Sequence, residues 1–126
     1  MTGPLDDARA HLSKAAQYLA AAELGIDEEL YDPATSAAVH CGINAKDAVC
    51  LKLTGRTGKT DDHHRAAAEL ERAGPSAAAM APTLRRLLAL KQRAEYRSAP
   101  TSSTDATEAL EWARRLHATA REILTS

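Results

Sequence analysis

The sequence predicts an all-α protein, an up-and-down bundle of four or five helices that forms one domain of 126 residues. Alanine, the best helix former, supplies 28 of these residues. Apolar residues recur every three or four positions, which is the period of one face of a helix. Leucine, isoleucine, valine and phenylalanine together number only 20, so we expect closely approaching helices around a thin core.

The first helix is predicted to begin at Pro4 and to end at Gly25. Proline suits the first helical turn, and Asp6 and Asp7 suit the positive end of the helix dipole. Its expected core face consists of Leu5, Ala8, Leu12, Ala15, Leu19 and Ala22. Residues 23–32 contain five acids and no base, so we expect a solvated turn there.

A second helix is predicted from Asp32, acting as N-cap, with Pro33 at its first position. It should run to about Leu53 and be closed by Gly55. Its expected core face consists of Ala38, Cys41, Ala45 and Ala48.

A polar loop leads to a third helix, which Thr60 or Asp61 should cap and which should end before Pro75. The pattern leaves the structure of residues 76–81 open. A fourth helix should begin at Pro82 and stop before Pro100.

The last helix is predicted to begin at Asp105, which forms a capping-box spacing with Glu108. Its core face repeats the three-four spacing at Ala106, Ala109, Ala113, Leu116, Ala120 and Ile123. We interpret the partly apolar Trp112 nearby as a packing or dimer-contact residue. Because the core is thin, burial of further surface in a homodimer is expected.

Residues 84–97 have a net charge of +4, although the whole chain sums to −1. The basic residues are Arg85, Arg86, Lys91, Arg93 and Arg97. Lys91 and Glu95 fall within the leucine arc of this helix, whereas Arg93 and Tyr96 face away from it. Because buried ions are costly unless paired, we interpret the C-terminal half of this helix as leaving the core and lining a polar groove.

Several classes of protein and site are disfavoured. No apolar run approaches the length of a membrane span, and the N-terminus is acidic, so we expect a cytoplasmic protein with no membrane contact. Cys41 and Cys50 would lie roughly 13 Å apart along one helix, too far for a disulfide. The five histidines have no zinc-binding spacing, and we expect neither a metal nor a cofactor.

The glycine-containing loop after the second helix superficially resembles a phosphate-binding loop. Gly58, Lys59 and Thr60 match the end of that motif, but Leu53 occupies the position of its first glycine, and the loop follows a helix. We interpret it as a helix end followed by a cap. With Arg56, the loop is nevertheless basic and could contact phosphate.

The basic helix is the strongest candidate for binding RNA or a nucleotide. A solvated basic face is the alternative, and the chain's three tyrosines and one tryptophan provide few rings for stacking bases. Only Tyr96 lies beside the arginines in the sequence.

The order of these features resembles the HEPN domain family, small bacterial helical proteins often found with nucleotidyltransferase-type partners. Residues 36–51 are similar to the family's serine-then-small-residue helix. His63 or His64 resembles its helix-starting histidine, and the run from Arg93 to Tyr96 resembles its arginine-to-tyrosine ending. The resemblance covers residues 12–124, and it implies a helical homodimer with a shared cleft. The candidate ligand-binding residues are Lys91, Arg93, Glu95, Tyr96, Arg97, His63 and His64.

The resemblance also implies a test for ribonuclease activity. Many HEPN proteins are metal-independent ribonucleases in which an arginine is followed four to six residues later by a histidine. Neither Arg93 nor Arg97 has a histidine at that spacing, and we attribute the Arg56–His63 spacing in the loop to chance. Arginine stays protonated, whereas histidine can exchange a proton near neutral pH.

We therefore expect a non-catalytic module that binds RNA, a nucleotide or a partner protein. It would form part of a toxin–antitoxin or nucleotidyltransferase-linked pair. One alternative is a ribonuclease toxin that uses Arg56 with His63 or His64. The other is a subunit that only makes protein contacts, with its arginines solvated.

Overall fold

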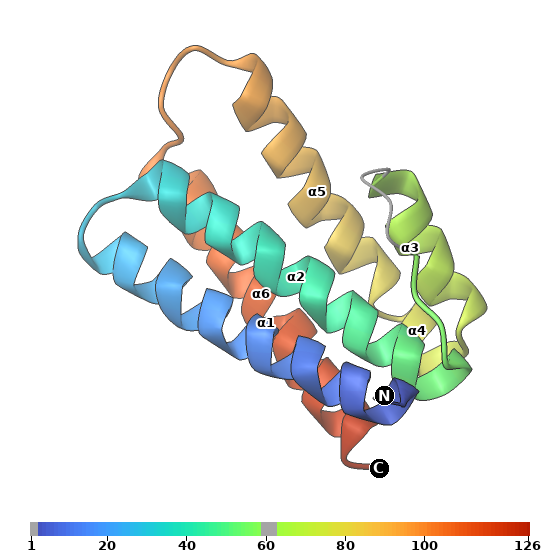
Figure 1. The fold of residues 1–126 in the computed structure, drawn as a ribbon. Coiled ribbons are helices and arrows are strands. Elements are labelled where there is room, and N and C mark those ends of the chain that lie inside the picture. Colours follow the sequence, from blue (N-terminus) through green and yellow to red (C-terminus); the bar gives the residue numbers. More distant parts are fainter. Residues whose placement is uncertain (1–2, 59–62) are drawn as a thin grey trace.

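The computed structural model describes residues 3–58 and 63–126, although it leaves the side chain of His63 undescribed. All regular secondary structure in these residues is helical (Figure 1). The helices are α1 (Pro4–Asp27), α2 (Tyr31–Thr54), α3 (His63–Arg72), α4 (Pro75–Ala78), α5 (Ala81–Tyr96) and α6 (Ser103–Leu124). The predicted all-α fold is confirmed, and the open connector contains the single turn α4.

The helix α2 is the centre of the bundle. It runs alongside α1 in the opposite direction, and α6 packs against both. On the other side of α2, α5 contacts α2 and α6, and α3 covers the first part of α5. Figure 1 shows α5 diverging from α2 toward its C-terminal end, while both chain termini lie at the opposite end of the bundle.

The core is built of small residues where helices approach closely and of leucines around α5. Ala8, Ala15 and Ala22 of α1 are fully buried, as their spacing predicts, whereas the prediction that Leu5 belongs to the core is wrong, since Leu5 is 40% exposed. All six predicted core residues of α6 are buried as well. At Gly42 of α2, an added Cβ would lie 2.7 Å from Leu87 Cδ2, so a side chain at this position would have to displace Leu87 at the contact between α2 and α5.

The predicted end of the first helix at Gly25 is wrong. The helix continues to Asp27, and Gly25 is buried against α2, where an added Cβ would lie 2.9 Å from Ala34 Cβ. The glycine therefore permits close packing of α1 and α2 and does not terminate α1. The turn that follows contains Glu29 at φ 58°, and the Leu30 amide donates to the Gly25 carbonyl at 2.7 Å.

The predicted N-caps Asp32 and Asp105 are also wrong. In both cases the observed hydrogen bond involves a residue of the loop after α5. The helix α2 begins at Tyr31, and the Asp32 carboxylate accepts a hydrogen bond from the Thr101 amide at 2.9 Å. Hydrogen bonds from the Thr101 side chain and from its amide lower the pKa of Asp32. Ser102 caps α6, and its hydroxyl accepts from the Asp105 amide at 3.1 Å. The loop is thereby tied to the start of α2. The predicted cap at Thr60 or Asp61 lies outside the described residues.

Other sequence predictions can be compared directly with the structure. Cys41 and Cys50 are free and buried, and burial raises the pKa of Cys41 to about 12. His40 is exposed and stacks on Tyr18 with ring centroids 5.0 Å apart. No helix in the described part of the chain is long and apolar enough to cross a membrane.

Candidate functional site

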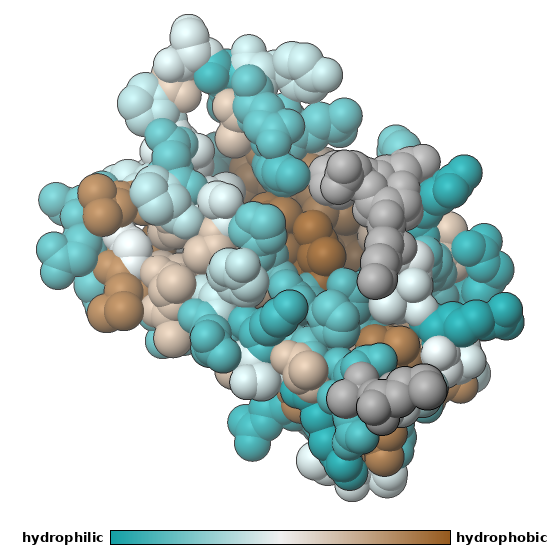
Figure 2. Space-filling view, in the orientation of Figure 1, coloured by the Kyte–Doolittle hydropathy of each residue, from teal (hydrophilic) through white to brown (hydrophobic). Residues whose placement is uncertain are grey.

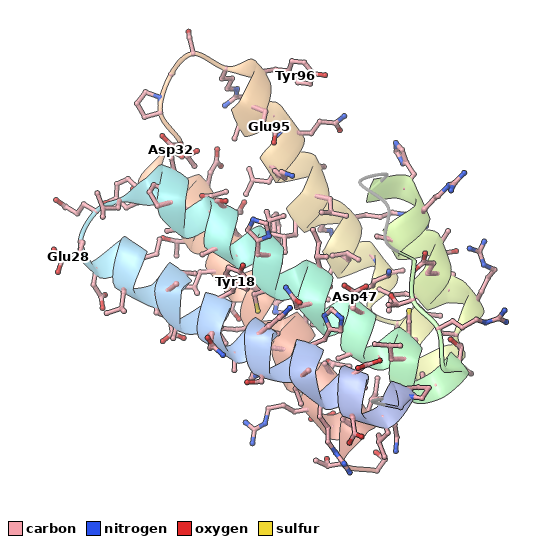
Figure 3. The ribbon with its side chains drawn as sticks, in the orientation of Figure 1. Tyr18, Glu28, Asp32, Asp47, Glu95 and Tyr96 are labelled. Carbon is pink, nitrogen blue, oxygen red and sulfur yellow. The ribbon has the colours of Figure 1, made fainter. Side chains whose placement is uncertain are left out.

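The C-terminal end of α5 projects from the bundle. Its leucines all lie between residues 84 and 90, and Leu90 is the last of them, only 2% exposed. Beyond it, Ala94 is the only aliphatic residue of the helix, so the apolar face that holds α5 against α2 and α6 ends there. Tyr96, at the tip, is 85% exposed, and Figure 3 shows its side chain pointing away from the other helices.

The ion pair predicted within the leucine arc forms at the edge of the core. Lys91 Nζ lies 3.6 Å from Glu95 Oε1, and the two side chains are 32% and 61% exposed. At such exposure, the pair contributes little to stability.

Two depressions flank Arg93 and Arg97. One is an open groove of about 360 Å³ that these arginines form with Gln92 and Tyr96. The other, of about 90 Å³, lies between the arginines and the loop leading to α6, with Asp105 at its edge. Among residues 3–58 and 64–126, no carboxylate forms an ion pair with Arg93 or Arg97. We call Arg93, Tyr96 and Arg97 the α5 tip.

Several other arginines are already paired with carboxylates. Arg85 forms an ion pair with Glu71 of α3, and Arg114 of α6 lies 3.4 Å from Glu23 of α1. Unlike Arg85 and Arg114, Arg93 and Arg97 of the α5 tip have guanidinium groups available for a ligand.

The two predicted histidines do not join the α5 tip. His64 is exposed in the first turn of α3 and lines neither depression. The side chain of His63 lies outside the described residues. Arg56, the arginine of the alternative catalytic pair, lies near the end of α2 on the wall of a separate cavity.

A buried lysine, which sequence reasoning missed, organises that end of the molecule. Lys46 of α2 is 3% exposed, and its ammonium group donates to Asp47 Oδ1 at 3.0 Å and to the Thr57 hydroxyl at 2.9 Å. Its third partner is Glu69 of α3, with which it forms an ion pair. All three ammonium donors are thus satisfied. We call these four residues the Lys46 cluster.

The cluster extends into the loop after α2 and onto α1. The Thr57 hydroxyl donates to Asp47 at 2.5 Å, and the Gly58 amide donates to Glu69 at 3.2 Å. On the other side, His11 Nδ1 of α1 lies 3.8 Å from Asp47 Oδ2. Figure 3 shows Asp47 between α1 and the loop that leads to α3. Four segments of the chain are therefore held together by charged and polar contacts.

The pKa shifts follow from these contacts. Burial alone would raise the pKa of Glu69, but the hydrogen bonds from Lys46 and Gly58 and the nearby positive charges outweigh it, so the pKa is lowered. Burial would likewise lower the pKa of Lys46, but its carboxylate partners outweigh that effect and raise the pKa. Both groups are therefore held in their charged forms.

We expect the stability of the protein to fall on acidification, partly through Glu69. Its pKa is lower in the folded chain, so its contribution is fully present above the unfolded value of about 4.3 and is lost as the pH falls through the folded value. Chemical denaturation between pH 6 and pH 3, settings chosen around that value, should therefore give a steeper loss of unfolding free energy for wild type than for Glu69→Gln. Parallel curves for the two proteins would contradict this assignment.

The described residues contain no group of three histidine, cysteine or carboxylate side chains placed to hold a metal ion. A family model described as the HEPN domain matches residues 8–123, nearly the whole chain. The chain belongs to the HEPN domain family. No curated protein matches it closely.

The α5 tip and the Lys46 cluster of this HEPN domain protein lie at different ends of α2. The α5 tip adjoins the loop that is bonded to Asp32 at the start of α2, whereas the Lys46 cluster lies near its end. The helical periodicity of α2 could have indicated that Lys46 is buried, because Lys46 lies on the same buried face as Gly42, Val49 and Cys50.

Proposed function

We propose that this HEPN domain protein binds single-stranded RNA at the α5 tip without cleaving it. The observation that carries the proposal is that Arg93, Arg97 and the exposed ring of Tyr96 line one open groove. An aromatic face beside guanidinium groups is the usual combination for holding unpaired bases and their phosphates.

Each side chain has a distinct task in this proposal. The two arginines provide charge and hydrogen-bond donors for phosphate oxygens. Tyr96 provides a surface on which a base can stack, and its exposure means that no protein contact must be broken first. Figure 2 supports this assignment, because the projecting end of α5 at the top of the view is mainly hydrophilic.

The same groups are suited to holding RNA and unsuited to cutting it. Cleavage through the 2′-hydroxyl needs a group that exchanges a proton near neutral pH. No histidine among the described side chains lines either depression at the α5 tip, and arginine remains protonated.

We expect the double variant Arg93→Gln/Arg97→Gln to bind a fluorescein-labelled single-stranded RNA about tenfold more weakly than wild type at low salt, because neither glutamine can neutralise a phosphate. Fluorescence anisotropy measures the affinity. The matched control is Arg114→Gln/Arg115→Gln, since these α6 arginines are paired with Glu23 and Glu111. The control should bind within about twofold of wild type.

Two results would contradict the proposal. One is equal weakening by both double variants, which would indicate binding through overall charge. The other is shortening of the RNA during the titration, followed on a denaturing gel. If cleavage disappears in His63→Ala or His64→Ala, the ribonuclease alternative is the correct one. The homodimer and the nucleotidyltransferase-type partner stay predictions from the sequence.

A further inference from the structure

We propose a second binding site in the cavity between the end of α2 and α3, for a molecule that carries a phosphate monoester. The cavity has a volume of about 500 Å³, within the range of small-molecule sites. The described residues that line it are Cys50, Thr54, Arg56, Thr57, Gly58, Glu69 and Arg72. The proposed RNA site at the α5 tip does not involve this cavity.

Two arginines from different elements line the cavity. Arg56 belongs to the loop after α2, and Arg72 is the last residue of α3. Both are exposed, and neither forms an ion pair with a carboxylate among the described residues. Arg72 helps to lower the pKa of Glu69, but that carboxylate is already bound to Lys46 and to the Gly58 amide.

The remaining polar groups of the wall are already satisfied. The Thr54 hydroxyl donates to the Cys50 carbonyl at 2.7 Å and accepts from the Arg56 amide at 3.2 Å. The Thr57 hydroxyl is shared between Lys46 and Asp47. Recognition of a ligand therefore falls to the two guanidinium groups, which match phosphate oxygens in geometry and charge.

The two guanidinium groups also determine which ligand charge fits the cavity. Two guanidiniums without carboxylate partners balance a dianion better than a single charge. A phosphate monoester carries close to two negative charges at neutral pH, whereas an internal phosphodiester of RNA carries one. The site should therefore prefer a terminal phosphate to the RNA backbone.

The wall is held in place before any ligand binds. The Lys46 cluster fixes Thr57, and Gly58 passes so close to Glu69 that an added Cβ would overlap its carboxylate. The Cys50 thiol lies on the wall, and burial raises its pKa to about 11. It is therefore a neutral, weakly polar surface for the organic part of the ligand.

This site is distinct from the α5 tip in position as well as in chemistry. It borders the end of α2, whereas the α5 tip adjoins the loop tied to the start of α2. With 24 residues, α2 is roughly 36 Å long. Substitutions at one site should therefore leave the other intact.

Isothermal titration calorimetry with adenosine 5′-monophosphate tests the proposal, with adenosine as the probe that lacks the phosphate. We expect saturable binding of the monophosphate, no binding of adenosine, and at least tenfold weaker monophosphate binding by Arg56→Gln and by Arg72→Gln. Arg115→Gln on α6 is the matched control and should bind as wild type does. Circular dichroism melting checks that each variant is folded.

A second pair of probes identifies the source of the phosphate. The probes are a trinucleotide with a 5′-phosphate and the same trinucleotide with a 5′-hydroxyl. Their binding is compared in Arg93→Gln/Arg97→Gln, in which the cavity is the only proposed site that keeps its arginines. Binding of the phosphorylated form alone supports an RNA end as ligand, and binding of the monophosphate but of neither trinucleotide supports a small molecule. Equal binding of adenosine and its monophosphate, or unchanged affinity in folded Arg56→Gln and Arg72→Gln, would overturn the proposal. Neither result would bear on RNA binding at the α5 tip.

Discussion

Replacing Lys46 by methionine is expected to lower the free energy of unfolding by about 3–5 kcal/mol, the usual cost of removing one partner from a buried ion pair. Methionine fills a similar volume, so the destabilisation comes from the groups left behind. The side chains of Asp47 and Glu69 are only 14% and 20% exposed, and both would be left without their cation. Chemical denaturation measures the change.

Two further variants separate the charge effect from packing. Lys91→Met removes a lysine whose pair with Glu95 is exposed, so its effect should stay below about 1 kcal/mol. Lys46→Met/Glu69→Gln should be more stable than the sum of its single variants predicts, because the unpaired carboxylate is neutralised. Equal destabilisation by Lys46→Met and Lys91→Met would show that the Lys46 cluster does not organise this end of the molecule.

Replacing Tyr96 by alanine is expected to weaken single-stranded RNA binding by about 1–3 kcal/mol, the usual contribution of one stacked base. Because the side chain is 85% exposed, the melting temperature should hardly change. The weaker affinity therefore appears in the anisotropy titration and not in a thermal melt.

Two control variants accompany this prediction: one keeps an aromatic ring at position 96, and the other removes a tyrosine elsewhere on the surface. Tyr96→Phe retains the stacking surface and should bind nearly as wild type does. Tyr18→Ala removes another partly exposed tyrosine, one that stacks on His40 on the α1–α2 face, and should leave RNA binding unchanged. If Tyr96→Phe binds as weakly as Tyr96→Ala, the hydroxyl and not the ring face makes the contact.

The helices and most of their core residues were predictable because helical spacing is a local property of the sequence. Ala8, Ala15 and Ala22, like the core positions of α6, follow from a three-four repeat that needs no knowledge of the partner helix. The helix ends were less predictable because the residues involved make distant contacts. Gly25 is required by Ala34 across the α1–α2 interface, and Asp32 binds the loop before α6.

The α5 tip and the Lys46 cluster also differ in how far the sequence alone could predict them. The α5 tip was predictable because the leucines of α5 stop at residue 90 while arginines continue to residue 97, all within one continuous stretch of sequence. The Lys46 cluster was not, because Glu69 lies on another helix, beyond the loop that follows α2. Without that pairing, a lysine on a buried face looks like an exception to the helical pattern, and no local signal identifies its partner.

The salt dependence of RNA affinity tests the central claim most directly, since it reports how many phosphates a protein neutralises. For single strands, the slope of log affinity against log salt changes by about 0.7 for each phosphate that is neutralised. Arg93→Gln/Arg97→Gln should therefore have a slope about 1.4 units shallower than wild type, while Arg114→Gln/Arg115→Gln keeps the wild-type slope. Identical slopes for wild type and Arg93→Gln/Arg97→Gln would mean that the α5 tip does not hold the RNA backbone.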